Sequence, residues 1–371
     1  MNLSYWEQKE WLSNIDFTIV GSGIVGLSTA VFLKKRFPKA KILVLEKGIL
    51  PQGASTKNAG FACFGSLSEL LEDLKSHSVD EVLSLLKNRV DGLQLLRQML
   101  GDKALDYKPY GGYELFLEKD QEFFNTCLEK VKDINALLSP VFKADVFSVV
   151  SNKFHFKGIQ PQYLFNQFEG QIDTGKMMHA LIQKTQNLGI TILNSTTVDS
   201  FVENTSSVLV KTNHFEFNSS KLIITTNGFT NKLIQQDLKP ARAQVLITKP
   251  ITNLKIKGTF HLDCGYYYFR NIDNRILLGG GRNLDFMGET TTEMSTTAKI
   301  QNELESLLHN VIFPNKNVDI DQRWSGIMGV DQKKLPLIRQ YSDCVFMGVR
   351  MGGMGVALGA GVAKKIVDLI P

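Results

Sequence analysis

The sequence predicts an α/β fold in which a nucleotide-binding domain is interleaved with a second, α+β domain built on an antiparallel sheet. Three observations carry this prediction. A strand–turn–helix–strand unit lies close to the N-terminus, residues 241–283 alternate strongly, and a Gly-rich stretch precedes a helix at the C-terminus. With 371 residues, of which 43% are hydrophobic and 21% charged, the chain is long enough for two ordinary globular cores.

The N-terminal unit covers residues 16–46. An apolar strand leads into Gly21-Ser22-Gly23-Ile24-Val25-Gly26, and a helix and a second strand follow before Glu46. The first glycine permits a tight turn, the second lets a pyrophosphate approach the backbone, and the third lets the helix pack closely on the strands. The helix N-terminus offers N–H groups to phosphates, and Glu46 is placed for a ribose hydroxyl. This order of parts predicts a dinucleotide site in a Rossmann-like domain.

The remaining elements follow from hydrophobic periodicity and turn signals. The predicted helices cover residues 66–105, 120–137, 173–188, 296–309 and 356–370, and the predicted strands cover 190–193, 208–210, 221–225 and several segments within 241–283. Their order predicts a nucleotide-binding domain made of residues 1–90, 170–239 and 325–371. The substrate domain is expected at residues 91–169 and 240–324.

Composition limits the classes of function. The net charge of +5 is modest and no Lys/Arg-rich block forms a stripe, so we expect no nucleic-acid partner. The N-terminus does not read as a signal peptide, and glycines and charges interrupt the last apolar stretch, so no membrane span is expected. Four cysteines without CxxC spacing predict a reducing, cytoplasmic location and no metal site: Cys63, Cys127, Cys264 and Cys344.

A second Gly-rich segment, Gly53-Ala54-Ser55-Thr56-Lys57-Asn58-Ala59-Gly60, is small and polar. It suits a loop that runs along a flat polar cofactor, and an ordinary surface loop fits the same residues equally well. The histidines are scattered, and we expect them at the surface or in the core and not in catalysis. They are His77, His155, His179, His214, His261 and His309.

Four blocks of sequence carry a family resemblance. They are the fingerprint with Glu46; the segment 53–60; Gly170-Gln171-Ile172-Asp173 before a helix; and Trp324-Ser325-Gly326 with the Gly-rich residues 351–358. Together they resemble the FAD-dependent amine and amino-acid oxidoreductases, the group of glycine oxidase, D-amino-acid dehydrogenase and sarcosine oxidase, over nearly the whole chain. Leu3-Ser4-Tyr5-Trp6 and residues 267–281 look closest to the gamma-glutamylputrescine oxidase branch.

The resemblance implies FAD and indicates how it lies. Residues 55–60 would follow the pyrophosphate, ribityl chain and flavin, and Val198 would meet the adenine through its backbone. The turn at 352–356 would aim a helix N-terminus at the flavin edge that gains negative charge on reduction. The cofactor-binding residues expected are Gly21, Ser22, Gly23, Ile24, Val25, Gly26, Glu46, Lys47, Ser55, Thr56, Lys57, Asn58, Ala59, Gly60, Val198, Asn227, Gly228, Gly326, Gly352, Gly353, Met354, Gly355 and Val356.

The chemistry implied is removal of a hydride from the carbon next to an amine nitrogen, which gives an imine that hydrolyses. Tyr267 matches the active-site tyrosine of relatives by its spacing to the following glycines. On a strand it shares a face with Phe269, whereas Tyr266, Tyr268 and Arg270 share the other face. A tyrosine over a flavin supplies an apolar wall and a hydrogen-bonding tip, and a core aromatic ladder fits each ring equally well.

Three positions depart from the relatives. Met328 stands where glycine oxidases carry the arginine for the substrate carboxylate, and Leu277 where sarcosine oxidases carry a lysine that promotes reaction with oxygen. Trp324 stands where those enzymes tether the flavin through a cysteine, so non-covalent FAD is expected. Arg350 and Arg270 are the candidate replacements as carboxylate anchors, and a structural ion pair fits each of them as well.

The leading hypothesis from sequence is an FAD-dependent oxidoreductase of a small amine or amino acid, with oxygen, a quinone or a dye as electron acceptor. Its expected substrate-site residues are Tyr267, Arg350, Arg270 and Met328. A flavin dehydrogenase of a 2-hydroxy acid or other non-amine is an alternative. A flavin-binding protein with a structural or tRNA-modification role is another. The substrate, the acceptor and the oligomeric state stay open.

Overall fold

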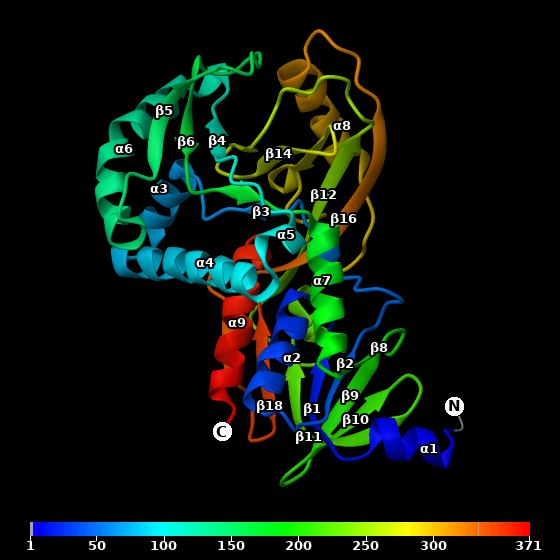
Figure 1. The fold of residues 1–371 in the computed structure, drawn as a ribbon. Coiled ribbons are helices and arrows are strands. Elements are labelled where there is room, and N and C mark those ends of the chain that lie inside the picture. The colour runs from blue at the N-terminus through cyan, green and yellow to red at the C-terminus, as the bar shows by residue number, and fades with distance from the viewer. Residues whose placement is uncertain (1–2, 333) are drawn as a thin grey trace.

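The computed structural model describes residues 3–332 and 334–371, so residues 1–2, at the start of the predicted FAD-binding domain, lie outside the described part. The chain forms two large sheets, one in the lower half and one in the upper half of the view in Figure 1. The C-terminus and the N-terminal helix α1 (Tyr5–Glu7) both lie in the lower half. The fold is therefore the predicted α/β arrangement of two interleaved parts.

The lower sheet has eight strands in the order β17-β18-β11-β1-β2-β8, with β10 joined to β11 and β9 joined to β10. Its central strands are parallel, because helices return the chain to the same edge each time. The strands are β1 (Ile15–Val20), β2 (Ile42–Leu45), β8 (Thr191–Leu193), β9 (Val198–Glu203), β10 (Val208–Thr212), β11 (Glu216–Ile224), β17 (Leu337–Gln340) and β18 (Val345–Val349).

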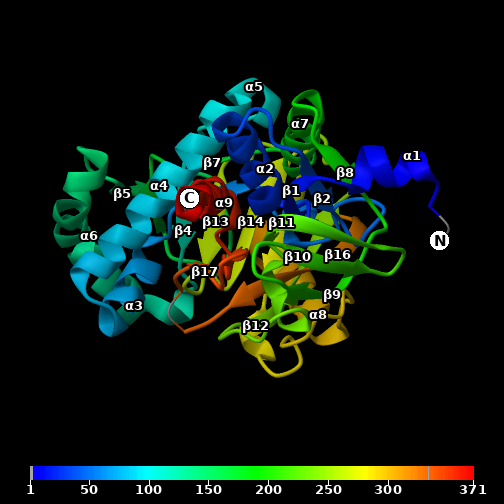
Figure 2. The same cartoon turned by 90° about the horizontal axis from the view of Figure 1, so that it is seen from below.

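Helices cover one face of this sheet, as the view from below shows (Figure 2). These helices are α2 (Ile24–Arg36), α7 (Thr174–Asn187) and α9 (Gly355–Leu369), with α4 (Val79–Leu100) packed on α9 and the short α5 (Asp102–Leu105) following it. The opposite face is covered by β9, β10 and the turn after β11. Both faces are therefore buried, which agrees with the continuous apolar run of β2 and with the burial of consecutive residues from Phe17 to Val20 in β1.

The upper sheet also has eight strands, in the order β16-β12-β15-β14-β13-β4-β6-β5. All of its pairings are antiparallel except that of β13 with β4. Its strands are β4 (Gly112–Leu115), β5 (Phe147–Ser151), β6 (Gln162–Asn166), β12 (Lys239–Thr248), β13 (Thr259–Leu262), β14 (Tyr267–Ile272), β15 (Arg275–Gly280) and β16 (Ile320–Val330).

One face of the upper sheet, here called the outer face, packs against α8 (Ala298–Leu307). Its centre is an aromatic cluster in which Phe260 and Phe269 stack with ring centroids 4.4 Å apart. At the far edge, α3 (Leu67–Ser76) and α6 (Gln121–Phe142) form a separate apolar cluster with β5 and β6. The other face of the sheet, the inner face, looks toward the lower half of the molecule.

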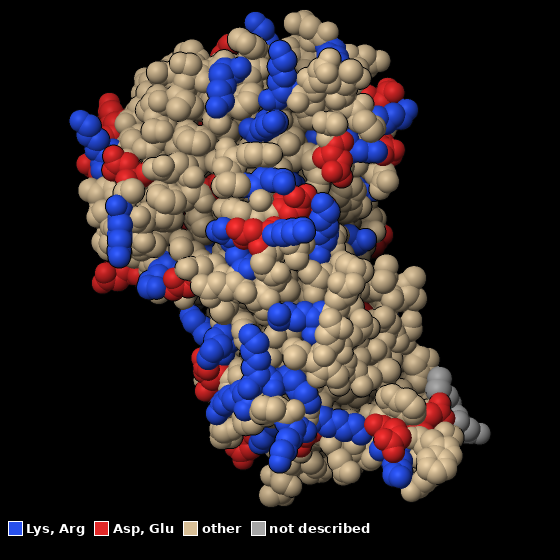
Figure 3. All heavy atoms as spheres, in the orientation of Figure 1, with Lys and Arg blue, Asp and Glu red and all other residues tan. Residues whose placement is uncertain are grey.

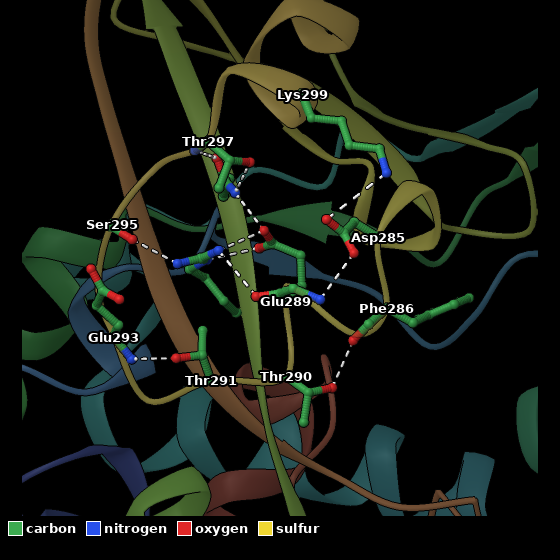
Figure 4. Close-up of polar contacts among 12 residues, drawn as sticks. Asp285, Phe286, Glu289, Thr290, Thr291, Glu293, Ser295, Thr297 and Lys299 are labelled. Carbon is green, nitrogen blue, oxygen red and sulfur yellow. Dashed lines mark hydrogen bonds and ion pairs between the residues drawn. The ribbon is translucent and has the colours of Figure 1, made fainter.

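A buried ion pair fixes the loop that covers the outer face beside β12 (Figure 4). Arg242 donates from Nε and Nη2 to the two carboxylate oxygens of Glu289 at 2.9 and 2.8 Å, and from Nη1 to Ser295 at 2.6 Å. Gln244 donates to Glu289 and to Thr297. Because both charges are paired and hydrogen-bonded, the pair can remain buried at the root of the loop.

The two halves meet at a short two-stranded ladder, β3 (Phe61–Ala62) with β7 (Gly170–Gln171). The strands of the upper sheet lie within residues 91–169 and 240–324, except that β12 begins at residue 239 and β16 continues to residue 330. We therefore propose to keep the predicted domain boundaries, with the substrate domain extended through β16.

Most predicted elements have counterparts in the structure. The helix predicted at 66–105 is divided into α3, α4 and α5, because Ser66 and Ser78 each form a capping box that starts a new helix. The helix predicted at 120–137 continues to Phe142. The pair of strands predicted at 208–210 and 221–225 is present, and its second strand also joins β1 in parallel.

Basic side chains gather at the lower end of the molecule (Figure 3). There α2 ends in Lys34, Lys35 and Arg36, and Arg36 Nη1 donates to the carbonyl oxygen of Val367 in the last turn of α9 at 2.7 Å. Cations at helix C-termini are stabilised by the helix dipole, which accounts for part of this cluster. Among the described residues, the helices are all too short or too polar to cross a membrane.

Candidate functional site

The turn after β1 forms the predicted phosphate cradle. Gly21 has φ of +103°, and a Cβ on Gly26 would collide with the carbonyl oxygen of Gly21. A Cβ on Gly23 would lie 2.7 Å from Ser55 Oγ. Ser55 Oγ accepts a hydrogen bond from the N–H of Ile24, the first residue of α2, at 2.9 Å. The turn therefore brings together the N-terminus of α2 and the hydroxyl of Ser55 from the second Gly-rich segment. A pyrophosphate site requires such an arrangement of N–H and O–H donors.

Glu46 lies directly after β2 and is buried, with 7% of its surface exposed. Its Oε2 accepts hydrogen bonds from the backbone N–H and the hydroxyl of Ser22 at 3.0 and 2.7 Å, and its Oε1 accepts one from Gly48 N at 3.0 Å. The carboxylate is thus held beside the phosphate turn. The backbone N–H of Thr196 donates to the carbonyl oxygen of Glu46, which brings Val198 to the same edge. The Lys47 side chain is exposed.

The Gly-rich loop (residues 53–63) runs between the two halves. Asn58 closes it, since its amide nitrogen donates to Ser55 O at 2.8 Å and its amide oxygen accepts from Gly60 N at 2.8 Å. Trp324 Nε1 donates to Lys57 O at 3.0 Å, which ties the loop to β16. The loop is therefore anchored to both halves, which favours the cofactor-loop interpretation over an ordinary surface loop.

The predicted cofactor-binding residues Asn227 and Gly228 and the turn at 352–356 lie where β11 and β18 end. Asn227 Oδ1 accepts from the backbone N–H groups of Arg350 and Met351 at 3.0 and 3.1 Å, so it joins the two strand ends. A Cβ on Gly228 would collide with the backbone of Met328. Helix α9 begins at Gly355, and a Cβ on Gly353 would lie 3.9 Å from the Met328 sulfur. The N-terminus of α9 and Met328 are therefore neighbours.

The inner face of the upper sheet presents two rows of side chains to the Gly-rich loop. Register places Glu114, His261, Tyr268 and Gly279 in one row across β4, β13, β14 and β15. The second row is Gly112, Thr259, Arg270 and Leu277. A Cβ on Gly279 would lie 2.7 Å from the Tyr268 ring, so this glycine makes room for the ring.

The structure places Tyr267, the tyrosine predicted for the active site, away from the Gly-rich loop. It shares a face with Phe269, as expected, and that face is the outer one, where Tyr267 packs with Ile300 of α8. Tyr268 faces the Gly-rich loop, with its ring 5.4 Å from that of Phe61. Spacing to the following glycines does not determine which face of a strand meets the loop, and consecutive residues lie on opposite faces. Burial raises the pKa of Tyr268 to about 12, so it stays protonated.

Arg270 is the most deeply buried large side chain of the site, with 2% of its surface exposed. Its Nε donates to the carbonyl oxygen of Ala59, and a Cβ on Gly60 would lie 2.7 Å from its Nη2. Within residues 3–332 and 334–371 it forms no ion pair with a carboxylate. Desolvation lowers the pKa of Arg270 to about 10, so it remains a cation at neutral pH. A buried cation without a counter-ion is costly and suits an anionic ligand.

Arg350 has a different environment. Its Nη1 pairs with Asp331 Oδ2 at 2.8 Å and also donates to Asp237 O, and its Nε donates to Leu335 O. The side chains of Arg350 and Asp331 are 9% and 14% exposed. The guanidinium is therefore engaged in a structural ion pair beneath the α9 turn, and these contacts do not favour a role as carboxylate anchor.

A buried polar cluster lies at the start of the first row and was not expected from sequence. His261 Nε2 donates to Glu169 Oε2 at 2.9 Å, and Thr259 Oγ1 donates to the same oxygen at 3.1 Å. Cys63 Sγ lies within 4.8 Å of a polar atom of each of His261 and Glu169. Burial, with the charge of Glu169, raises the pKa of the Cys63 thiol well above its usual range, so the thiol stays neutral and the three groups are not assigned as metal ligands.

Other predicted residues lie on the inner face or beside it. Leu277 packs with Ala59 and Val245 in a small apolar cluster at the Gly-rich loop, and Trp324 and Phe61 adjoin it. A Cβ on Gly326 would lie 2.8 Å from the Lys57 side chain. The pieces predicted from four separate blocks of sequence thus lie close together where the two halves join.

Comparison with known families gives one match across the chain. The family described as FAD dependent oxidoreductase matches residues 16–369. A curated relative, the bifunctional protein ThiO/ThiG of Synechocystis, is 22% identical over 245 residues, which are 62% of this chain and 32% of that protein. The chain therefore spans about a third of the length of this relative.

Solved structures share the fold over almost the whole length. L-proline dehydrogenase from P. horikoshii superposes with a TM-score of 0.74 and 17% identity, covering 96% of this chain and 93% of that one. Glycine oxidase from Geobacillus kaustophilus gives 0.75 and 16%, covering 96% and 94%. Iminodiacetate oxidase from Chelativorans sp. BNC1 gives 0.75 and 15%, covering 95% of each chain. At these identities the likeness concerns the fold.

Proposed function

Because the chain belongs to the family of FAD-dependent oxidoreductases, we propose that it oxidises the carbon–nitrogen bond of a small amine or amino acid. Similar folds include a glycine oxidase, an L-proline dehydrogenase and an iminodiacetate oxidase, whose names all denote oxidation of amino acids. The observation that carries the proposal is Arg270, a buried cation without a carboxylate partner that faces the Gly-rich loop. Its charge favours a substrate that carries a carboxylate.

The cofactor is FAD, and the residues present fit it. The cradle at Gly23 has no room for a side chain, and α2 and α9 both begin beside the residues that join the halves. We propose that the Gly21–Val25 turn and Ser55 hold the pyrophosphate, that Glu46 binds a ribose hydroxyl, and that the α9 turn faces the flavin. Trp324, and not a cysteine, stands at the position where relatives of this kind link the flavin covalently. We therefore keep the prediction that FAD binds without a covalent link.

Bound FAD supplies the two-electron acceptor, and the protein supplies orientation and a dry site. In our proposal Arg270 holds the substrate carboxylate through its free guanidinium nitrogens. Tyr268, with Phe61 and Leu277, forms an apolar wall that excludes water and turns the substrate carbon toward the cofactor. The iminium product then hydrolyses in water after release.

Met328 supports the same assignment of Arg270. Its uncharged thioether lies beside the turn before α9 and cannot pair with a charge. The carboxylate of the proposed substrate therefore needs another partner. Arg270 stands on the inner face, is buried and forms no ion pair with a carboxylate among the described residues. Tyr267 is not retained in the proposed site, because its ring lies on the outer face.

The proposed electron acceptor is a quinone or dye in preference to oxygen. Leu277 places an apolar side chain where a lysine would promote reaction with oxygen, and it lies buried against Ala59. We also keep the cytoplasm as the proposed location, because the four cysteines are free and three of them are buried.

The proposal is tested by anaerobic bleaching of the flavin absorbance with a panel of amino acids, amines without a carboxylate, and 2-hydroxy acids. We expect at least one small amino acid to bleach the flavin and to release ammonia or an amine. Bleaching by 2-hydroxy acids alone would replace the proposal with a hydroxy-acid dehydrogenase. A flavin that no compound reduces, in protein with a full complement of FAD, would favour a binding role.

A further inference from the structure

The buried pair His261–Glu169 has a geometry that the proposed function does not use. Nε2 of His261 donates to Glu169 at 2.9 Å, and the carboxylate also accepts from Thr259, so the imidazole is fixed in one orientation. Its other nitrogen, Nδ1, has no hydrogen-bond partner in the part of the chain that the structure describes. A carboxylate that holds one imidazole nitrogen leaves the other as a proton acceptor.

His261 also stands directly beside the proposed substrate wall. It is the cross-strand partner of Tyr268, and the Phe61 ring lies 5.3 Å from the imidazole and 5.4 Å from the Tyr268 ring. The imidazole is buried, with 6% of its surface exposed. The imidazole and the Tyr268 ring are therefore buried against the same aromatic side chain.

Two further carboxylates lie near His261, in a separate hydrogen-bonded group of β4 and α3, and no hydrogen bond among the described residues joins this group to the imidazole. Glu114 is the neighbour of His261 across β4 and β13, and it accepts hydrogen bonds from the Ser68 hydroxyl and backbone N–H. Ser68 Oγ lies 3.4 Å from Ser66 Oγ, which in turn accepts from the backbone N–H of Glu69. Glu69 is half-buried at the N-terminus of α3.

We propose that His261, oriented by Glu169, is the residue that accepts the proton of the substrate amine. The inference rests on the proposed amine oxidation. An ammonium nitrogen has no lone pair to stabilise the carbon that loses hydride, so its N–H bond must break first. The proton goes to Nδ1 of His261 and the lone pair stays on nitrogen. The hydride then leaves carbon to the bound FAD as the C=N bond forms.

Charges around the pair determine its pH dependence. Burial alone would lower the pKa of His261, but the charge and hydrogen bond of Glu169, with Glu69 and Glu114, raise it to about 9. The pair accepts a proton only when His261 is neutral, so oxidation should accelerate as pH rises toward about 9. The titratable groups that face the imidazole are Cys63, Glu69, Glu114, Glu169 and Tyr268.

The first test measures the rate of anaerobic flavin bleaching between pH 6 and pH 10, with an amino acid that reduces the native protein. His261→Gln replaces the imidazole by an amide that cannot accept a proton. At pH 10, where the native imidazole is mostly neutral, we expect a rate at least about 100-fold lower, as for loss of a general base, and we expect loss of the ionisation near pH 9. His179→Gln, at an exposed position on α7, is the matched control and should keep the native profile. An unchanged profile in His261→Gln overturns the proposal.

The second test needs no substrate. Negative charge gained by the flavin on reduction should raise the proton affinity of the pair, so the native protein should take up an extra proton above about pH 9. For a two-electron couple each proton adds about 30 mV per pH unit to the slope of the reduction potential. We expect the native slope above pH 9 to exceed that of His261→Gln by this amount, and equal slopes would contradict a proton-accepting pair.

If the whole panel of substrates fails to bleach the native flavin, the amine-oxidation proposal has failed, whereas the potential measurement still decides whether His261 is coupled to the flavin.

Discussion

Tyr267 and Tyr268 are consecutive on β14 and face opposite sides of the upper sheet. Tyr267 lies in the aromatic core under α8, whereas Tyr268 lies against Phe61 of the Gly-rich loop. Alternation along a strand makes this separation unavoidable. Two rings that look equivalent in sequence therefore have different roles, one in stability and one in the candidate site.

The pair of tyrosines supplies a matched comparison. Tyr268→Phe removes a hydroxyl from the inner face and should lower kcat/KM for amino-acid oxidation by about 10-fold or more, with little change in melting temperature. Tyr267→Phe should leave kcat/KM within about twofold, because its ring contacts the outer core. Steady-state kinetics with a dye acceptor measure both variants. The reverse order of effects would restore Tyr267 to the site.

Arg270→Met should discriminate between substrate classes. If Arg270 binds the substrate carboxylate, the variant should lose kcat/KM for amino acids by a factor equivalent to about 2–5 kcal/mol, the usual cost of breaking a buried charged pair. Oxidation of amines without a carboxylate should change little. Arg275→Met is the control, since Arg275 pairs with Asp321 at a partly exposed edge of the same sheet. Equal losses for amines and amino acids would remove Arg270 from carboxylate binding.

Arg350 and Asp331 should behave as a structural pair. Arg350→Met leaves Asp331 without its cation and should lower the free energy of unfolding by about 3–5 kcal/mol, whereas Arg350→Met combined with Asp331→Asn should cost less than the sum of the two single changes. Denaturant unfolding of the four proteins gives this comparison. A stable Arg350→Met variant that had lost only amino-acid oxidation would show that Arg350 is the anchor after all.

The glycine cradle predicts which glycine is needed for FAD. Gly23→Val should yield colourless protein, because even a Cβ at this position would lie 2.7 Å from Ser55 Oγ in the pyrophosphate site. Gly53→Ala is the control, since its Cβ would meet nothing within 4 Å. Absorbance at the flavin band measures retention. Acid denaturation of the native protein should release FAD into solution, and yellow precipitate would indicate a covalent link.

Leu277 predicts slow reaction of the reduced cofactor with oxygen. It is buried against Ala59 and Val245 and offers no charge to assist electron transfer to oxygen. Stopped-flow reoxidation by air should be slower than flavin reduction by substrate, and reoxidation by a quinone or dye should be faster. Leu277→Met, which keeps the apolar volume, is expected to leave this order unchanged. Air reoxidation as rapid as substrate reduction would identify an oxidase.

The sequence by itself determined the local parts of the protein. The glycine fingerprint and the alternation over residues 241–283 indicate turns and strand faces through neighbouring residues. The family blocks led to FAD for the same reason, because a phosphate cradle is formed by a few consecutive residues. These features need no knowledge of which strand lies beside which.

Only the tertiary structure decided how distant residues meet. Sheet register placed Tyr268 and not Tyr267 toward the Gly-rich loop, and it brought His261 to Glu169 across 92 residues. The position of Arg350 before the α9 turn brings its guanidinium to Asp331. The candidate carboxylate anchor is therefore part of a structural ion pair. Side-chain periodicity gives the two faces of a strand but not which face is buried against what, because that depends on pairings between segments far apart in the chain.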